Sequence, residues 1–529
     1  MKRMMAGTLL LLAAGAAAQD DGRAAAFRDR VAYLASDDMR GREAGSPDYD
    51  RAAAWLATRF AAVGLRPAGP DGFLQPVPLV SATPADQGQV ALIAAGTTRP
   101  LAFGADYLPE VDPNRAVVAI DAPMVFAGYG VSAPAQGHDD YAGLDVRGKV
   151  VVVFGGAPKA MQGEVRAHFG NGITKRAEAA RRGAVAVLTL YSPTQEAVTP
   201  FARRVPSWNA ARMAWRTPAG TGFDPGRIPG AGTLSEAGAA KLLGAQAAAL
   251  RAAETAGRPF PAVSLPSRLR VRYANRLGRA ESSNVVGLIP GSDPRLRDEY
   301  VVLTAHLDHV GVGTPVNRDA IYNGAMDNAA GIATLLGVAE RFGAAGAPRR
   351  SVLLVAVTAE EKGLVGSDYF ARHPVRPRRS LVANVNLDMP VLLYDFTDMV
   401  AFGADRSTLG PIVRAALRPL GIASTPDPDP QEGIFTRSDH YRFVQQGVPS
   451  VALKPGPANG GAAADRDFRR NHYHQPSDDL SLPIRWTQGV RFVDANYAIA
   501  RMVADAPDRP RWNRGDFFGT LYKGPMATR

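Results

Sequence analysis

The sequence has no cysteine among its 529 residues. The chain therefore has no disulfide, no thiolate metal site and no cysteine nucleophile, and a buried core must hold the fold together. A chain of this length can form such a core, most simply as two or three domains. Hydrophobic residues make up 46% and charged residues 21%. These proportions are typical of a globular protein rather than a disordered or membrane-embedded one.

Long apolar runs are also scarce, and the only candidate lies at the N-terminus. Lys2 and Arg3 precede an apolar run around Leu9–Leu12, which gives way to small residues up to Ala18. This order predicts a secretory signal peptide over residues 1–18, because the run is shorter than the ~20 residues of a membrane span. We therefore expect an exported protein, periplasmic or extracellular, that is not an integral membrane protein.

The formal charge of +11 is spread over small basic clusters rather than one stripe. No motif interleaves basic and aromatic residues, so a nucleic-acid partner is not expected. Attraction to an anionic envelope surface stays open, and the sequence does not determine the oligomeric state.

Composition and periodicity divide the rest of the chain into four parts. Residues 19–112 are expected to begin the main domain with helices over 27–34 and 46–63. Residues 113–268, with short β-branched runs, are expected to form an inserted β-rich domain. Residues 269–506 alternate strands and helices, and residues 507–529 form a basic tail without an assigned role.

The alternation in residues 269–506 predicts an α/β domain with a mostly parallel central sheet flanked by helices. Apolar β-type runs cover residues 300–305, 351–358, 383–387 and 449–454, and helices are expected over 328–342 and 484–504. Ligands of such sheets bind beyond the carboxyl ends of the strands.

Polar residues follow three of these predicted strands. His306 and Asp308 follow the first, Glu360-Glu361 follow the second and Asp388 follows the third. Asp327 stands among small residues at the predicted start of a helix, and His474 comes later in the chain. Imidazole and carboxylate groups in this number fit two divalent ions of the zinc type, with one carboxylate left over as a base.

These segments resemble the signature blocks of the co-catalytic di-zinc aminopeptidases, a family that also includes glutamate carboxypeptidases and glutaminyl cyclases. The similarity covers the N-terminal helices and about residues 275–505, and it implies a zinc exopeptidase fold. Residues 140–150, Asp-Tyr-Ala-Gly-Leu-Asp-Val-Arg-Gly-Lys-Val, resemble part of the protease-associated domain that is often inserted in these enzymes.

The resemblance implies a role for each residue of the set. Asp327 would bridge two zinc ions, with His306 and Asp388 on one ion and Glu361 and His474 on the other. Glu360 would be the general base for a metal-bridging hydroxide that attacks the peptide carbonyl. Other residues would support the site: Asp308 would hold the His306 imidazole, and Asp439 and His440 would contact the substrate or the ligands.

Three readings of the function stay open. The first is an aminopeptidase that acts on peptide substrates. The second is a carboxypeptidase or glutaminyl-cyclase-like enzyme of the same fold, and the third is an inactive binding protein. Residues 455–471, rich in glycine and alanine, are expected to form a mobile loop before His474 that either gates the site or is an inert insertion.

Overall fold

The computed structural model describes residues 20–161 and 163–528, which fold into two compact units. Unit 1 comprises Met1–Val77, Glu281–Pro428 and Arg437–Arg529, and unit 2 comprises Pro78–Ala280 and Asp429–Thr436. The predicted signal peptide lies outside the described residues. In the part of the chain that is described, no helix is long and apolar enough to cross a membrane.

The insertion is longer than the predicted 113–268. Strands β2 (Leu74–Pro84) and β13 (Arg268–Ile289) both run through the unit boundaries without a break. The proline- and glycine-rich stretch that is expected in the main domain instead forms short strands of unit 2. These strands are β3 (Gln89–Ala94), β4 (Thr97–Pro100) and β5 (Tyr107–Leu108).

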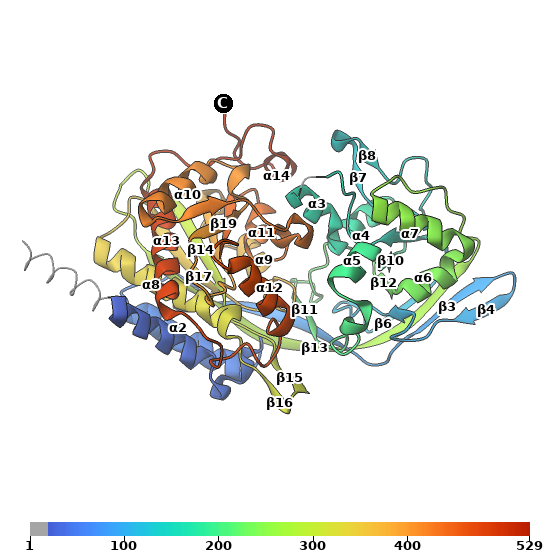
Figure 1. Ribbon diagram of the computed structural model, residues 1–529, viewed down its shortest axis with the longest axis horizontal. Helices are drawn as coiled ribbons and strands as arrows, with labels where there is room; N and C mark the ends of the chain where they lie inside the picture. The colour runs from blue at the N-terminus through green and yellow to red at the C-terminus, as the bar shows by residue number, and fades with distance from the viewer. Residues whose placement is uncertain (1–19, 162, 529) are drawn as a thin grey trace, which may run out of the picture. The chain divides into compact units, whose positions relative to one another are not determined.

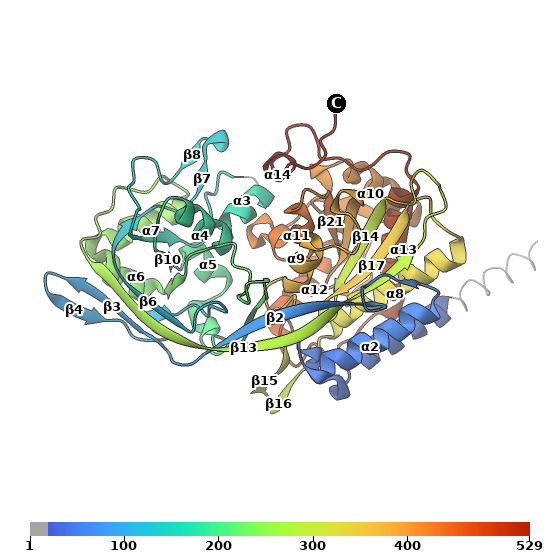
Figure 2. The ribbon, with the colours of Figure 1, turned by 180° about the vertical axis from the view of Figure 1, so that it is seen from behind.

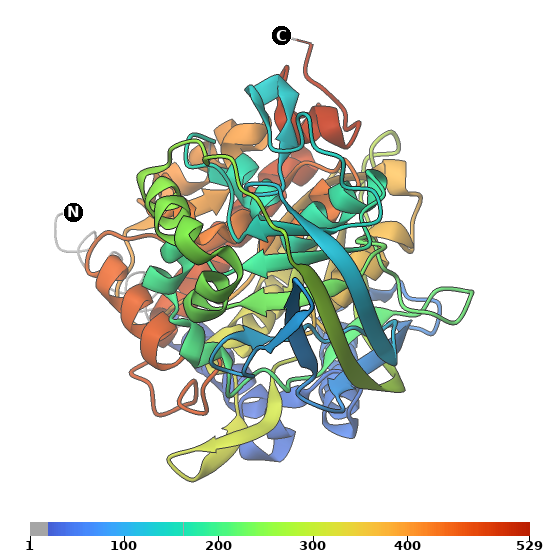
Figure 3. The same ribbon diagram turned by 90° about the vertical axis from the view of Figure 1, so that its right-hand side faces the viewer.

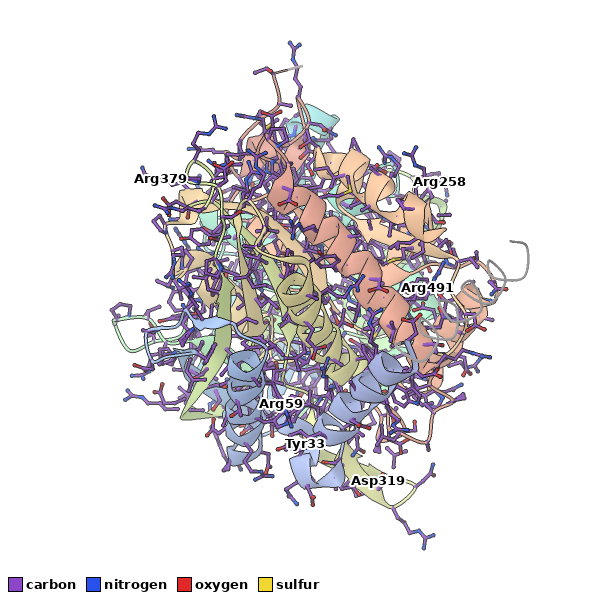
Figure 4. The ribbon with its side chains drawn as sticks, turned by 90° about the vertical axis from the view of Figure 1, so that its left-hand side faces the viewer. Tyr33, Arg59, Arg258, Asp319, Arg379 and Arg491 are labelled. Atoms are coloured by element: carbon purple, nitrogen blue, oxygen red, sulfur yellow. The ribbon has the colours of Figure 1, made fainter. Side chains whose placement is uncertain are left out.

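Unit 1 begins with the two predicted helices, over residues 20–34 and over α2 (Pro47–Ala62). The Ser46 hydroxyl accepts a hydrogen bond from the Tyr49 N–H at 3.2 Å, and Pro47 occupies the first turn. Both features favour a helix start. Tyr33 stacks on Trp55 with ring centroids 4.8 Å apart, and Arg59 lies over the same indole (Figure 4). This contact ties the two helices together at the surface.

The central sheet of unit 1 has the predicted parallel core. Its strands run in the order β1-β13-β17-β14-β18-β21-β19-β20, and β17, β14, β18 and β21 are mutually parallel. The bounds are β1 (Arg66–Pro67), β14 (Tyr300–His306), β17 (Ser351–Val357), β18 (Leu381–Leu387), β19 (Asp398–Phe402), β20 (Ala423–Thr425) and β21 (Ser450–Pro455).

Helices cover both faces of this sheet, as expected for buried parallel strands. On one face, α8 (Ala330–Ala345) and α13 (Trp486–Asp505) pack together with α2 against the strands (Figures 1 and 2). On the other face, α9 (Val365–Arg372) and α11 (His440–Val444) pack against side chains such as Val302 and Leu353. Helix α10 (Leu409–Leu417) packs on α13.

One prediction about unit 1 needs correction, and one segment without an assigned role proves to be folded. Most of the expected loop at 455–471 is helix α12 (Gly461–Asn471), because Phe468 is fully buried and anchors the segment in the core. The C-terminal residues are also folded. They carry α14 (Phe517–Leu521), and the buried Trp512 donates a hydrogen bond from Nε1 to the Gly447 carbonyl at 2.8 Å.

Unit 2 is built on two groups of strands that share β6 (Val117–Phe126). In one, β5-β12-β10-β9-β6 lie side by side, and in the other β6 pairs with β13, which also pairs with β3 (Figure 3). Its other strands are β9 (Val150–Phe154), β10 (Ala186–Leu190), β11 (Arg212–Trp215), β12 (Gly230–Leu234), β7 (Ser132–Ala133) and β8 (His138–Asp139). Its helices are α3 (Gly163–Gly170), α4 (Gly172–Arg181), α5 (Pro193–Val198), α6 (Glu236–Leu243) and α7 (Ala247–Ala256).

Candidate metal centre

The predicted ligands converge at the carboxyl edge of the parallel sheet in unit 1. His306 ends β14, Glu361 follows β17 and Asp388 follows β18. Asp327 lies in the segment Ala325–Ala329 that leads into α8, and its own backbone dihedral angles are not helical. These positions are far apart in the sequence, and only the pairing of the strands brings them together.

One group of donor atoms consists of His306, Asp327 and Asp388. The His306 Nε2 atom lies 3.1 Å from Asp327 Oδ1 and 3.3 Å from Asp388 Oδ1. Two ligands of one tetrahedral zinc ion at ~2.1 Å would be ~3.3 Å apart. The three side chains are therefore spaced as ligands of a single divalent ion.

A second group lies on the other side of Asp327. The His474 Nε2 atom is 3.3 Å from Asp327 Oδ2 and 2.9 Å from Glu361 Oε2. Asp327 thus offers one carboxylate oxygen to each group. A carboxylate placed in this way can bridge two ions, as two-metal hydrolytic sites require.

The chemistry of this donor set fits divalent cations. Oxygen and imidazole nitrogen donors suit zinc and related ions, and no thiolate is involved. The electrostatics of the cluster also favour a cation. Burial opposes the charged forms, but the carboxylates raise the pKa of His306 and His474 well above the ordinary value, while the two histidines lower the pKa of Asp327. The carboxylates of the cluster therefore favour positive charge between them.

Glu360 differs from its neighbour Glu361. Burial and the nearby Glu361, Asp439 and Asp388 raise the pKa of Glu360 well above its usual range, against the opposing charge of His306. For Glu361, burial is outweighed by His474 and by its hydrogen bonds, which lower its pKa. Two adjacent carboxyl groups are thus held in opposite states: one binds histidines, and the other is poised to hold a proton.

His309 is a member of the cluster that the sequence left without a role. Its Nδ1 atom lies 2.7 Å from Glu361 Oε1, and the residue is fully buried. With Asp327 and Glu361 it forms a second group of donor atoms spaced to hold a metal ion. The predicted ligand His474 faces both Asp327 and Glu361 with its Nε2 atom, whereas His309 contacts the remaining Glu361 oxygen. The position of His309, three residues after His306, was the available signal.

Asp308 supports the site differently from the expectation. The His306 Nδ1 atom faces the Asp308 backbone carbonyl at 3.0 Å, not its carboxylate. The carboxylate instead accepts hydrogen bonds from the backbone N–H groups of Glu360 at 3.1 Å and Glu361 at 3.3 Å. Burial raises the pKa of Asp308 to about 6.

Asp439 and His440 are both fully buried at the start of α11. Burial raises the pKa of Asp439 to about 7, and Glu360 lies close enough to be affected by its charge. This placement fits a supporting position behind Glu360 rather than a contact with substrate. The preceding Ser438 donates a hydrogen bond to Asp388 Oδ2, which leaves Asp388 Oδ1 directed at His306.

Asp478 fixes the segment that carries Asp327. Its carboxylate accepts hydrogen bonds from the backbone N–H of Met326 at 2.9 Å and of Asp327 at 3.0 Å. The residue is fully buried, and its pKa rises to about 7 because of that burial. Asp478 follows His474 by four residues, so one segment supplies both a candidate ligand and the support of another.

An N-terminal segment, residues 37–43, contacts the loops that carry the candidate ligands. The buried Arg42 guanidinium donates hydrogen bonds to the carbonyls of Leu307 at 3.0 Å, Asn323 at 2.8 Å and Gly324 at 3.2 Å, and also to the Leu34 carbonyl. These carbonyls belong to the loops that carry the ligands His306 and Asp327 and to the first helix. Nothing in the sequence pattern pointed to this residue.

The same segment makes two further contacts with these loops. Glu43 forms an ion pair with Lys362 at 2.7 Å, directly after the two glutamates. Gly41 has φ near +68°, and a Cβ atom there would lie 2.4 Å from the Tyr322 carbonyl oxygen, so only glycine fits. The segment contacts the hairpin β15 (Gly311–Val316) and β16 (Asp319–Tyr322), which Figure 2 labels.

The backbone is strained where it delivers these side chains. Ala359, Met389 and His474 all have positive φ, between 50° and 54°. The first precedes Glu360, the second follows Asp388, and the third is itself a candidate ligand. Left-handed backbone at non-glycine residues costs about 1–2 kcal/mol each. Packing around the site must offset this cost, which is a common property of functional sites.

Known proteins resemble the part of the chain that carries this centre. Residues 284–500 match the sequence profile described as Peptidase family M28. Aminopeptidase NAALADL1 of Rattus norvegicus is 26% identical over 213 residues, which are 39% of this chain and 25% of that protein. Probable glutamate carboxypeptidase LAMP1 of Arabidopsis thaliana is 31% identical over 140 residues, 26% of this chain and 19% of that protein. The chain thus covers a quarter or less of the length of these relatives.

The fold has a counterpart among solved structures. The aminopeptidase from Aneurinibacillus sp. strain AM-1 superposes over 92% of this chain and 95% of its own, with a TM-score of 0.52 and 19% identity. The predicted fold class, a mixed α/β domain with a central sheet flanked by helices, is confirmed by this similarity.

Proposed function

We propose that this protein is an exported di-zinc aminopeptidase. It removes N-terminal residues from peptides. The match of residues 284–500 to peptidase family M28 supports this proposal. The observation that carries the proposal is the position of Asp327, which directs one carboxylate oxygen to the His306 side and the other to the His474 side. The aminopeptidase among its relatives supports the choice of reaction.

Zinc ions bound at this centre would supply Lewis acidity and lower the pKa of water. The residues of the chain supply the geometry and the proton transfer. Asp308 orients the His306 ring through its backbone carbonyl and holds the N–H groups of Glu360 and Glu361 through its carboxylate. Glu360, whose pKa burial raises, suits a base that accepts a proton from water and returns it to the departing amine.

The experiment is hydrolysis of a panel of aminoacyl p-nitroanilides by the full-length protein, with their N-acetyl derivatives as controls. We expect cleavage of free-amine substrates only, lost on treatment with a chelator and restored by zinc. Metal analysis is expected to give two zinc ions per chain. Cleavage of N-acetylated peptides from the C-terminal end would instead establish a carboxypeptidase. The similarity to the Arabidopsis protein is the reason to test this alternative.

The export of the protein and the nature of unit 2 are part of the same proposal. Residues 1–18 act as a signal peptide, and unit 2 is a protease-associated domain. N-terminal sequencing of the protein from the medium or periplasm of an expressing bacterium tests the first point and is expected to start at Gln19. A cytoplasmic protein that retains Met1 or Lys2 would refute it.

A further inference from the structure

Lys454 lies in the same row of the sheet as two of the candidate ligands. Leu387 of β18 and Leu453 of β21 are register partners, so the next residues, Asp388 and Lys454, are neighbours on adjacent strands. Adjacent strands are about 4.8 Å apart. On the far side of Asp388, the His306 Nε2 atom lies 3.3 Å from its Oδ1. The row His306–Asp388–Lys454 therefore extends from the metal centre along the sheet edge.

The ammonium group of Lys454 has no partner of its own among the described residues. The side chain is half-buried, and neither a hydrogen bond nor an ion pair is formed by its Nζ atom. The nearest acids are engaged elsewhere. Asp388 faces His306 with one oxygen and Ser438 with the other, and Asp465 of α12 pairs with Arg469 at 2.6 Å.

The ammonium group is therefore available to an anionic group of a ligand, and a charge contact in a partly buried position is stronger than one at the open surface. Register partners on neighbouring parallel strands project to the same side of a sheet, so Lys454 and Asp388 leave the sheet edge on the same side. Arg469 and three acids, Asp388, Asp465 and Asp327, lie within range of the Lys454 charge. A group bound there lies next to the peptide bond that the metals would hold. The sequence pattern does not indicate that Lys454 lies beside the metal centre, because it stands at the end of an apolar strand, 66 positions from Asp388.

We propose that Lys454 is a substrate-recognition residue that binds a carboxylate of the substrate immediately next to the scissile peptide bond. This proposal rests on the proposed peptidase function and names its substrate class. The carboxylate has two possible sources. It is either the side chain of an N-terminal glutamate or aspartate, or the free C-terminus of a dipeptide.

Two arms distinguish these sources in the wild-type protein. The first compares kcat/KM for glutamyl and glutaminyl p-nitroanilides, which have the same shape and differ in charge. The second compares alanyl-alanine with alanyl-alanine amide. A hydrogen bond to a charged group favours the acidic member of one pair by about 10- to 100-fold. The pair that shows the preference identifies the source.

Variants then test whether Lys454 causes the preference. Lys454→Met keeps the length of the side chain and is expected to bring the preferred ratio close to one. Lys454→Glu is expected to invert it, so that a lysyl p-nitroanilide becomes better than the glutamyl one. Lys159→Met, which removes the same charge from an exposed position in unit 2, is the matched control and is expected to keep the wild-type ratio.

The outcomes separate this proposal from the proposed function. Ratios near one in both wild-type arms, with neutral substrates cleaved, would overturn the role of Lys454 and leave the peptidase intact. A preference that survives in Lys454→Met would also overturn it. No cleavage of any arylamide or dipeptide by the zinc-loaded protein would overturn both. The two comparisons in the wild-type protein show whether a carboxylate is preferred, even if a variant fails to fold.

Discussion

Replacement of Arg42 by methionine should destabilise unit 1 and weaken metal binding together. Arg42 donates hydrogen bonds to four backbone carbonyls, and three of these bonds measure 2.8–3.2 Å. Each bond from a charged donor contributes about 1.5–3 kcal/mol, so the gross contribution is about 6–12 kcal/mol. Methionine fills similar space but leaves all four carbonyls without this donor.

The cost of burying the guanidinium must be subtracted. Burial lowers the pKa of Arg42 from 12.5 to about 10, which corresponds to about 3 kcal/mol against the charged form. The net loss in Arg42→Met is then at least about 3 kcal/mol, in the range observed when one partner of a buried charged contact is removed. The stability of Arg42→Lys should fall between those of the wild-type protein and Arg42→Met, because one ammonium group cannot reach carbonyls in three separate segments.

The assay is urea unfolding of the metal-free protein followed by tryptophan fluorescence, with zinc affinity measured by calorimetry. The two units need not unfold together, so the transition of unit 1 must be resolved. Arg40→Met is the matched control, because Arg40 is two residues away, exposed and paired with Asp48 only at 3.6 Å. If Arg42→Met unfolds at the wild-type urea concentration and binds zinc with wild-type affinity, the reasoning about this segment is wrong.

Three further predictions follow from the site and from unit 2. Glu360→Gln should lower kcat by about 10²–10⁴-fold while two zinc ions still bind. Glu361→Gln should instead lose metal. Equal metal content and equal activity in the two variants would contradict their separate roles. Asp308→Asn should weaken zinc binding by about 10–100-fold in a calorimetric titration, because the amide offers one acceptor where the carboxylate offers two. In unit 2, burial lowers the pKa of His168 from 6.5 to about 4. The unfolded chain therefore binds the extra proton first, and the stability that is complete above pH 6.5 should fall by up to about 3 kcal/mol as the pH drops to 4. Urea midpoints across this range should stay flatter in His168→Gln, and an unchanged slope would exclude His168 as the source.

Much of the fold was predictable because local signals agreed with one another. Ser46 and Pro47 mark the start of α2, and the apolar runs before His306, Glu360 and Asp388 are strands of the parallel sheet. The boundaries of unit 2 were not predictable. Strands β2 and β13 continue through them, so no change in composition marks the border. The segment at 455–471 looked like a loop because its glycines and alanines are weakly patterned, yet the burial of Phe468 makes it a helix.

The sequence by itself determined which residues could form a metal centre. Their types are set by coordination chemistry, and the positions of His306, Glu361 and Asp388 at strand ends follow from hydrophobic pattern, which is local information. Tertiary structure alone decided how each residue is used. Arg42, His309 and Lys454 join the site through strand register and loop packing, contacts between residues distant in the chain. The backbone carbonyl of Asp308 contacts His306, and its carboxylate holds the next loop. Which of the two groups faces His306 depends on the surrounding fold rather than on sequence spacing.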